Sequence, residues 1–144
     1  MRIEHQFSIA GFEVSVSFPD GWDADTLLPS FRPFYGKKEG QEKALLKCTV
    51  CTSVENKAAM PSGELIENTL SDMGYVSLYK EAEGYCVTLS AEQGGTLHVM
   101  QTDRRFSTVR VYLHEEDKRA GHALSSLLRI AYSQAVLYWD AVSI

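Results

Sequence analysis

The sequence predicts one α+β domain, spanning residues 1–144, in which an antiparallel β-meander sheet packs against a long C-terminal helix. As far as Leu113, apolar residues alternate with polar ones in short runs, which is the period of half-buried strands. After His114 they recur every three or four residues, which is the period of a helix with one apolar face. A length of 144 residues and a hydrophobic content of 44% suit a single domain with one core.

The first predicted element is a β-hairpin over residues 3–18. A two-residue turn at Ala10 and Gly11 places apolar residues opposite one another in three pairs: Ile9 with Phe12, Phe7 with Val14, and Ile3 with Phe18. The polar residues of the hairpin fall on its other face, which we expect to point outward; they include Arg2, Glu4, Glu13 and Ser15.

A connection and two further strands are predicted next. Residues 27–34 contain two prolines, which exclude a regular helix and favour an ordered, partly buried connection. Residues 44–54 are rich in Val, Thr and Cys and predict a strand. Residues 64–73 also favour a strand, with a short helix as the alternative.

Four more apolar runs predict the rest of the meander, at residues 76–78, 85–91, 97–99 and 109–113. The segments between them are short and polar, as in tight turns. Three-residue loops at 93–95 and 103–105 would pair Leu89 with Val99 and Val99 with Val109. One apolar face would then continue across three neighbouring strands.

A helix is expected to start near Asp117, where acidic residues suit the positive end of the helix dipole. Its apolar stripe consists of Ala120, Leu124, Leu127, Leu128, Ala131, Ala135 and Tyr138. Ile130, Leu137 and Trp139 add apolar surface outside this stripe, which predicts that a further surface covers that side. Residues 140–144 are expected to begin another strand.

Composition excludes several classes of function. A formal net charge of −5 argues against a nucleic-acid partner. The N-terminus lacks the apolar core of a signal peptide, and no run is long enough to cross a bilayer, so we expect a cytoplasmic protein with no membrane partner. An odd number of cysteines, Cys48, Cys51 and Cys86, favours reduced thiols over disulfides.

The C-terminal part carries a family resemblance. The runs Leu127-Leu128-Arg129-Ile130-Ala131-Tyr132-Ser133 and Val136-Leu137-Tyr138-Trp139-Asp140-Ala141-Val142-Ser143-Ile144 resemble the segment that precedes the nucleotide-binding half of bacterial proteins similar to HPr kinase/phosphorylase and phosphoenolpyruvate carboxykinase. The resemblance implies an N-terminal domain of a larger protein, truncated before its P-loop domain. It implies that this missing domain is the partner and that ATP and a divalent metal belong to the parent protein. No functional residue of the family carries over, because the matching positions are absent.

The sequence offers no catalytic, cofactor-binding or metal site with a specific motif. It contains neither a Gly-x-x-x-x-Gly-Lys-Ser/Thr loop nor a Gly-x-Ser-x-Gly elbow. Cys48 and Cys51 have the spacing of redox and zinc sites, but residues three apart on a strand face opposite ways, which favours a structural role. Arg104 and Arg105 at a predicted turn are interpreted as ordinary exposed residues rather than as an anion site.

The four histidines are candidate ligands, each with a structural alternative. His5, opposite Val16 near the end of the hairpin, is interpreted as a rim or hydrogen-bonded core residue. His98 shares a strand face with Met100 and Thr102, and it is a candidate only if that face is covered. The densest titratable group is formed by His114, Glu115, Glu116, Asp117 and His122. We interpret this group as a solvated helix start rather than a metal site.

Aromatic side chains are a further candidate, because they can line a small-ligand pocket, although most are expected in the core. They are Phe31, Phe34, Tyr35, Tyr75, Tyr79, Tyr85, Tyr132, Tyr138 and Trp139.

Three hypotheses of function follow from the sequence. The first is a noncatalytic accessory domain of an ATP-dependent kinase-like or carboxykinase-like protein, which is the reading we favour. The second is a stand-alone module that binds a small apolar ligand or a peptide strand. The third is a small metal-dependent enzyme that uses His114, His122 and the neighbouring carboxylates.

Overall fold

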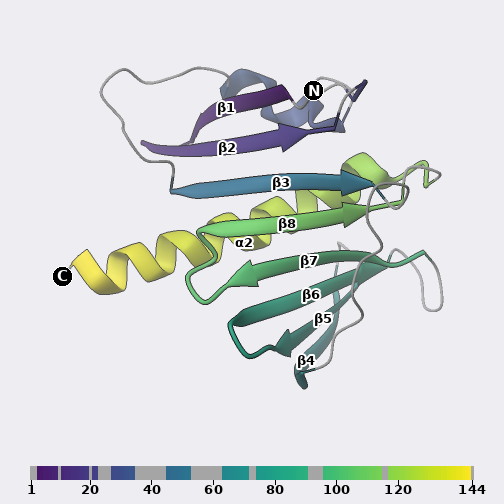
Figure 1. Ribbon diagram of the computed structural model, residues 1–144, viewed down its shortest axis with the longest axis vertical. Coiled ribbons are helices and arrows are strands. Elements are labelled where there is room, and N and C mark those ends of the chain that lie inside the picture. The colour runs from purple at the N-terminus through teal and green to yellow at the C-terminus, as the bar shows by residue number, and fades with distance from the viewer. Residues whose placement is uncertain are drawn as a thin grey trace.

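The computed structural model describes residues 3–9, 11–19, 21–22, 27–34, 45–52, 63–71, 74–90, 96–114 and 117–143 (Figure 1). Its strands are β1 (Ile3–Ile9), β2 (Phe12–Phe18), β3 (Leu46–Thr52), β4 (Glu64–Ser71), β5 (Gly74–Lys80), β6 (Gly84–Ser90), β7 (His98–Asp103) and β8 (Thr108–Leu113). A 3-10 helix, η1 (Pro29–Phe34), follows β2, and the long helix α2 (Ala120–Ser143) follows β8. The α+β class expected from the sequence is confirmed.

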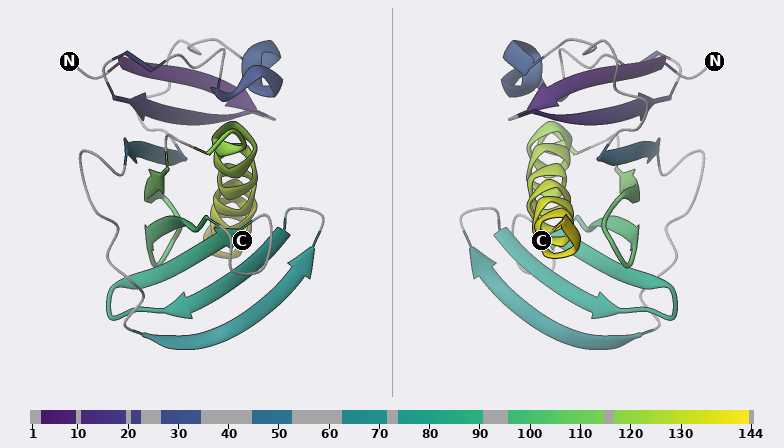
Figure 2. Two further views of the ribbon diagram at one scale, coloured as in Figure 1. Left: turned by 90° about the vertical axis from the view of Figure 1, so that its right-hand side faces the viewer. Right: turned by 90° about the vertical axis from the view of Figure 1, so that its left-hand side faces the viewer.

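The eight strands form one open sheet in the order β1-β2-β3-β8-β7-β6-β5-β4. Most neighbouring pairs are antiparallel, but β3 lies parallel to both β2 and β8. The sheet curls around α2, so that β1 and β2 lie on one side of the helix and β4 to β6 on the other (Figure 2). The meander expected from the sequence therefore covers β4 to β8, and β3 joins it to the N-terminal hairpin.

The N-terminal hairpin has the predicted register, with Ile9 opposite Phe12 and Ile3 opposite Phe18. The expectation that its polar face is exposed is wrong for Glu13 and Ser15, which are 3% and 6% exposed. Leu45, directly before β3, continues the pairing with β2, and its N–H donates to the Glu13 carbonyl at 2.8 Å. Alternation placed these side chains on the correct face, but tertiary packing buries that face here.

The predicted register of β7 is wrong by one residue against β6 and by three residues against β8. Leu89 lies opposite His98 rather than Val99, and Val109 lies opposite Thr102. The turn between β7 and β8 is longer than the predicted three residues, and its geometry is set by Asp103. A shift by an odd number of residues exchanges the two faces of a strand, so Met100 lies in the core where Val99 was expected.

Helix α2 buries its predicted apolar stripe against the concave face of the sheet. The buried helix residues are Ala120, Ala123, Leu124, Leu127, Leu128, Ala131 and Ala135. Tyr138, expected in the same stripe, is 38% exposed. The strand expected over residues 140–144 is not formed: the helix continues to Ser143, because no glycine or proline interrupts it after Gly121.

The connection over residues 27–34 is ordered and partly buried, as expected. Leu28 and Phe31 are buried, and the Phe31 ring packs edge-on against Phe7 with 5.5 Å between ring centroids. The segment therefore caps one end of the core beside the N-terminal hairpin.

Candidate functional site

An apolar groove of about 660 Å³ lies between the concave face of β4 to β6 and the C-terminal half of α2. Strands β5 and β6 supply its floor through Val76, Leu78, Tyr85 and Val87. The helix forms one wall through Ile130, Gln134, Leu137 and Tyr138, and β4 forms the other through Ile66, Glu67 and Thr69. The surplus apolar residues Ile130 and Leu137, noted in the sequence, thus face this groove.

One end of the groove is closed by the turn between β7 and β8. Asp103 organises this turn, since its side chain accepts hydrogen bonds from the Ser107 N–H at 2.9 Å and from the Ser107 hydroxyl at 2.6 Å. Phe106 adopts a left-handed backbone with φ of 57°, and its ring stacks on Tyr85 with 5.4 Å between centroids. The strained residue therefore brings an aromatic ring to the groove wall.

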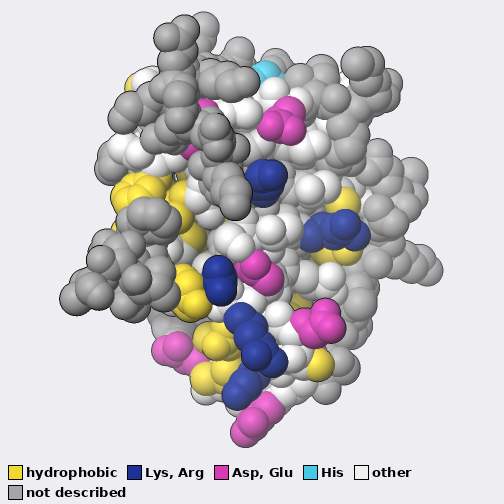
Figure 3. All heavy atoms as spheres, turned by 60° about the vertical axis from the view of Figure 1, so that its left-hand side comes forward, with side chains coloured by type: hydrophobic (Ala, Val, Ile, Leu, Met, Phe, Trp, Pro, Cys, Tyr) yellow, Lys and Arg dark blue, Asp and Glu magenta, His cyan; other side chains and the backbone are white. Residues whose placement is uncertain are grey.

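The two arginines of this turn are exposed, as predicted, but each has a partner. The Arg104 Nη2 donates to the Ala82 carbonyl at 3.2 Å, and the side chain lines the groove. The Arg105 guanidinium lies over the Tyr138 ring, with 5.2 Å from Cζ to the centroid. On the face turned toward the viewer in Figure 3, basic side chains lie directly beside hydrophobic ones. The mouth of the groove is therefore polar at its rim and apolar within.

Strand β4 is the outer wall of the groove and the edge of the sheet. Its residues 64–70 are all exposed, including Leu65 at 49%, Ile66 at 51% and Leu70 at 66%. A β-bulge between Leu65 and Glu67 makes Ile66 the extra residue, and both Ile66 and Glu67 line the groove. Of the features that protect edge strands against unwanted pairing, β4 has the bulge and two glutamates but no lysine or proline.

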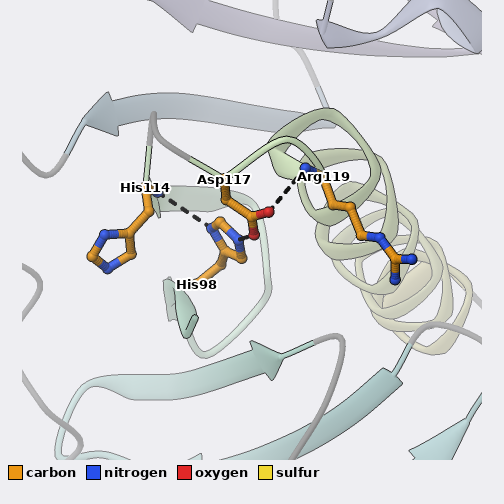
Figure 4. Close-up of polar contacts among 4 residues, drawn as sticks. All are labelled: His98, His114, Asp117 and Arg119. Atoms are coloured by element: carbon orange, nitrogen blue, oxygen red, sulfur yellow. Dashed lines mark hydrogen bonds and ion pairs between the residues drawn. The ribbon is translucent and has the colours of Figure 1, made fainter. Parts of the chain in front are cut away.

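A second constellation joins β7 to the start of α2 (Figure 4). The His98 side chain is 2% exposed, and its Nε2 lies 2.7 Å from the Asp117 Oδ2. The His114 N–H donates to the other ring nitrogen at 3.4 Å, so Nε2 carries the proton and donates to Asp117. The second Asp117 oxygen accepts the Arg119 N–H at 2.9 Å, which caps the first turn of the helix.

These contacts define what the pair can do. The Arg119 N–H, followed by the hydrogen bond from His98, holds the pKa of Asp117 below its ordinary value. Both nitrogens of His98 are occupied, and its ring is buried, so the pair fastens the helix start to the sheet.

The structure does not gather the titratable residues around Asp117 in the way that their spacing in the sequence suggested. Asp117 contacts His98, which lies on the covered face of β7, whereas His122 is exposed. Glu115 and Glu116 lie outside the described residues. Within the described ranges, no three or more His, Cys, Asp or Glu side chains gather as metal ligands.

The cysteines occupy structural positions. Cys48 belongs to the core cluster and pairs with Val109, whereas Cys51 pairs with Tyr112 on the opposite face of β3. All three cysteines are buried thiols outside any disulfide. Burial, with a smaller contribution from the Glu81 carboxylate, raises the pKa of Cys86 to about 11, so its thiol stays protonated at neutral pH.

The remaining candidates lie at three places. His5 is partly buried at the rim of the hairpin, where its ring packs edge-on against Phe18 with 5.7 Å between centroids. Phe31 and Tyr132 line a smaller cavity of about 210 Å³, and the Tyr132 hydroxyl donates to the Ile9 carbonyl at 2.9 Å. Of the aromatic residues considered, Tyr85 and Tyr138 line the groove, whereas the side chains of Phe34, Tyr35 and Trp139 lie outside the described residues.

Comparisons of the chain with protein-family models, with curated proteins and with solved structures found no match. In the described part of the chain, no helix has the length and apolar character needed to span a bilayer. The groove is therefore the candidate functional site on its geometry alone.

Proposed function

We propose that this chain is a noncatalytic accessory domain of an HPr kinase-like or phosphoenolpyruvate carboxykinase-like, ATP-dependent protein. In this proposal the groove and the adjoining end of α2 form its docking surface for the nucleotide-binding domain. ATP and its divalent metal belong to that domain, and the present chain supplies a packing surface.

The observation that carries the proposal is the exposed apolar surface at the end of α2. Leu137 is 60% exposed and Tyr138 is 38% exposed, and both border a groove with an apolar floor. Apolar surface of this kind on a small domain typically marks an interaction site. The resemblance of residues 127–144 implies that this surface would adjoin the segment that enters the P-loop domain.

The first test is to read the open reading frame beyond Ile144 for a strand, a glycine-rich P-loop and a helix. If they are encoded, Leu137→Asp in the longer protein should lower ATP-dependent phosphotransfer and increase hydrogen exchange of the amides around Val136. Leu70→Asp is the matched control, because Leu70 is 66% exposed and does not line the groove. The absence of a downstream P-loop, or unchanged activity and exchange in Leu137→Asp, would refute the proposal.

A second candidate function is favoured by the volume of the groove. About 660 Å³ with an apolar floor and few polar groups matches a site for a small apolar ligand. Dodecanoate, as a probe, should then raise the melting temperature of the chain, and Leu78→Trp should abolish the shift by filling the floor. No shift with the unmodified chain would exclude this candidate for fatty-acid-like ligands.

A further inference from the structure

The outer edge of β4 and the groove form one continuous surface. β4 is the last strand of the sheet, and its eight residues form a ledge about 26 Å long at roughly 3.3 Å per residue. On an edge strand, alternate backbone N–H and C=O groups point outward, where another strand can pair with them. Ile66, Glu67 and Thr69 project from the same strand into the groove.

We propose that β4 binds an extended segment of a partner protein as a ninth strand, whose alternate side chains enter the groove. The segment is mostly apolar on its groove-facing side and carries a Lys or Arg opposite Glu67. This inference rests on the proposed docking role of the groove and names the kind of segment that docks there. It does not depend on which protein supplies that segment.

The curvature of the sheet favours a strand as the occupant. The strands from β8 to β4 curl around α2 (Figure 2), and a strand added beside β4 would extend this curve over the exposed side of the helix. Its groove-facing side chains would lie between Ile66 on β4 and Leu137 on α2, which are 51% and 60% exposed. Backbone pairing would supply general affinity, and the groove would select alternate side chains.

The charges of β4 indicate the chemistry of that segment. Its two charged residues are both acidic, and Glu64 lies opposite Lys80 of β5, whereas Glu67 lies opposite Leu78. The Glu67 carboxylate accepts the Thr69 hydroxyl at 3.2 Å and borders the groove. In the part of the chain that the structure describes, no Lys or Arg forms an ion pair with Glu67. A basic side chain on the added strand would supply this missing partner.

A second copy of the chain fits this edge less well. Pairing β4 with β4 would bring four carboxylates to one joined edge and add no cation, since β4 contains no Lys or Arg. A partner strand with a basic residue at one groove-facing position satisfies both the backbone and the carboxylate.

The test uses the 144-residue chain and a fluorescein-labelled probe peptide, Thr-Val-Thr-Val-Thr-Lys-Thr-Val-Thr, with blocked ends. Its valines and lysine share one face of a strand. Fluorescence anisotropy should show binding. Two further peptides carry N-methyl groups, one at the odd-numbered residues and one at the even-numbered residues. Only the peptide whose methyl groups replace the N–H groups that face β4 should bind at least tenfold more weakly. No binding at 100 μM, or equal binding of both methylated peptides, would overturn the proposal.

Two protein variants locate the peptide on β4. Ile66→Lys should weaken binding at least tenfold, whereas Leu65→Lys should change it less than threefold. These neighbours are 51% and 49% exposed, but only Ile66 lines the groove. Equal effects of the two variants would overturn the proposal, as would sedimentation of the free chain as a dimer that both variants dissociate.

A charge exchange tests the chemistry. Glu67→Lys should weaken binding of the lysine peptide at least tenfold. A peptide with glutamate in place of that lysine should bind the Glu67→Lys variant within threefold of the original affinity. If neither peptide binds the Glu67→Lys variant, the predicted contact is refuted. If the strand binds but no P-loop domain is encoded downstream, only the proposed parent protein is wrong. If a P-loop domain packs on the groove while the β4 amides remain in fast exchange, only the strand inference is wrong.

Discussion

Replacing Asp117 with alanine should destabilise the fold by about 2–4 kcal/mol. The carboxylate has two tasks, because one oxygen accepts the Arg119 N–H at 2.9 Å and the other accepts the His98 Nε2–H at 2.7 Å. Loss of a helix cap costs about 1 kcal/mol. Leaving the buried His98 donor without a partner costs a further 1–3 kcal/mol or so.

Asp117→Asn separates the two contributions. Asparagine caps a helix about as well as aspartate, so the contact with Arg119 is retained. Its amide group would meet the His98 Nε2–H donor to donor, and the other ring nitrogen already accepts the His114 N–H. We therefore expect a loss of about 1–3 kcal/mol, which is smaller than the loss for Asp117→Ala.

Urea denaturation at pH 7, followed by circular dichroism, measures both differences in the free energy of unfolding, provided that the m-values agree. A loss below about 0.5 kcal/mol for Asp117→Ala, which is the size of an ordinary surface change, would refute the role assigned to this pair. Equal losses in the free energy of unfolding for Asp117→Asn and Asp117→Ala would refute only the capping role of Asp117.

The same residue predicts a pH dependence. The Arg119 N–H and then His98 lower the pKa of Asp117 in the folded state, so its contribution to stability is fully present above the unfolded pKa of about 3.9. This contribution is lost as the pH falls through the folded pKa. The stability difference between the unmodified chain and Asp117→Asn should be constant from about pH 5 to 7 and shrink below about pH 4. A difference that stays constant down to pH 2 would contradict this cause.

Three further predictions test the core. Leu124→Ala, at a fully buried position, should lower the free energy of unfolding by about 2–5 kcal/mol in urea denaturation. The matched Leu137→Ala, at a 60% exposed position, should lower it by less than about 0.5 kcal/mol. Equal losses would contradict the assigned helix face. Gly121→Ala should lower the melting temperature although alanine favours helices, because the new Cβ would lie 2.9 Å from the Leu27 carbonyl oxygen; a higher melting temperature would show that this contact relaxes. Cys86, with a pKa raised to about 11, should react with Ellman's reagent at pH 8 only after unfolding. Because the folded state favours the protonated thiol, the contribution of Cys86 to stability falls as the pH rises from about 9 to 11. Rapid labelling of the folded chain would contradict its burial.

Much of the local structure could be predicted from the sequence, because alternation and helical periodicity are local patterns. The hairpin register followed from Phe7 and Val14 opposite each other, and strand β4 was correctly favoured over a short helix. The register of β7 was predicted wrongly on both sides, and only its pairing with β8 involves the turn that Asp103 organises. The one-residue difference against β6 placed His98 on the helix side, where it meets Asp117.

The groove was indicated only in part. Ile130 and Leu137 signalled surplus apolar surface on the helix, but their partner surface comes from β4 and β5, far away in sequence. That β4 lies at the edge of the sheet follows from the parallel placement of β3 between β2 and β8, for which no local pattern exists.

The sequence by itself determined the fold class, most strand and helix positions, and the buried stripe of α2, because each depends on neighbours within a few residues. The tertiary structure decided the strand order, the faces of β7 and of Glu13, and the joining of His98 to Asp117. These features depend on contacts between distant segments, whose free energy outweighs local preference. The groove and its open edge strand belong to this second group.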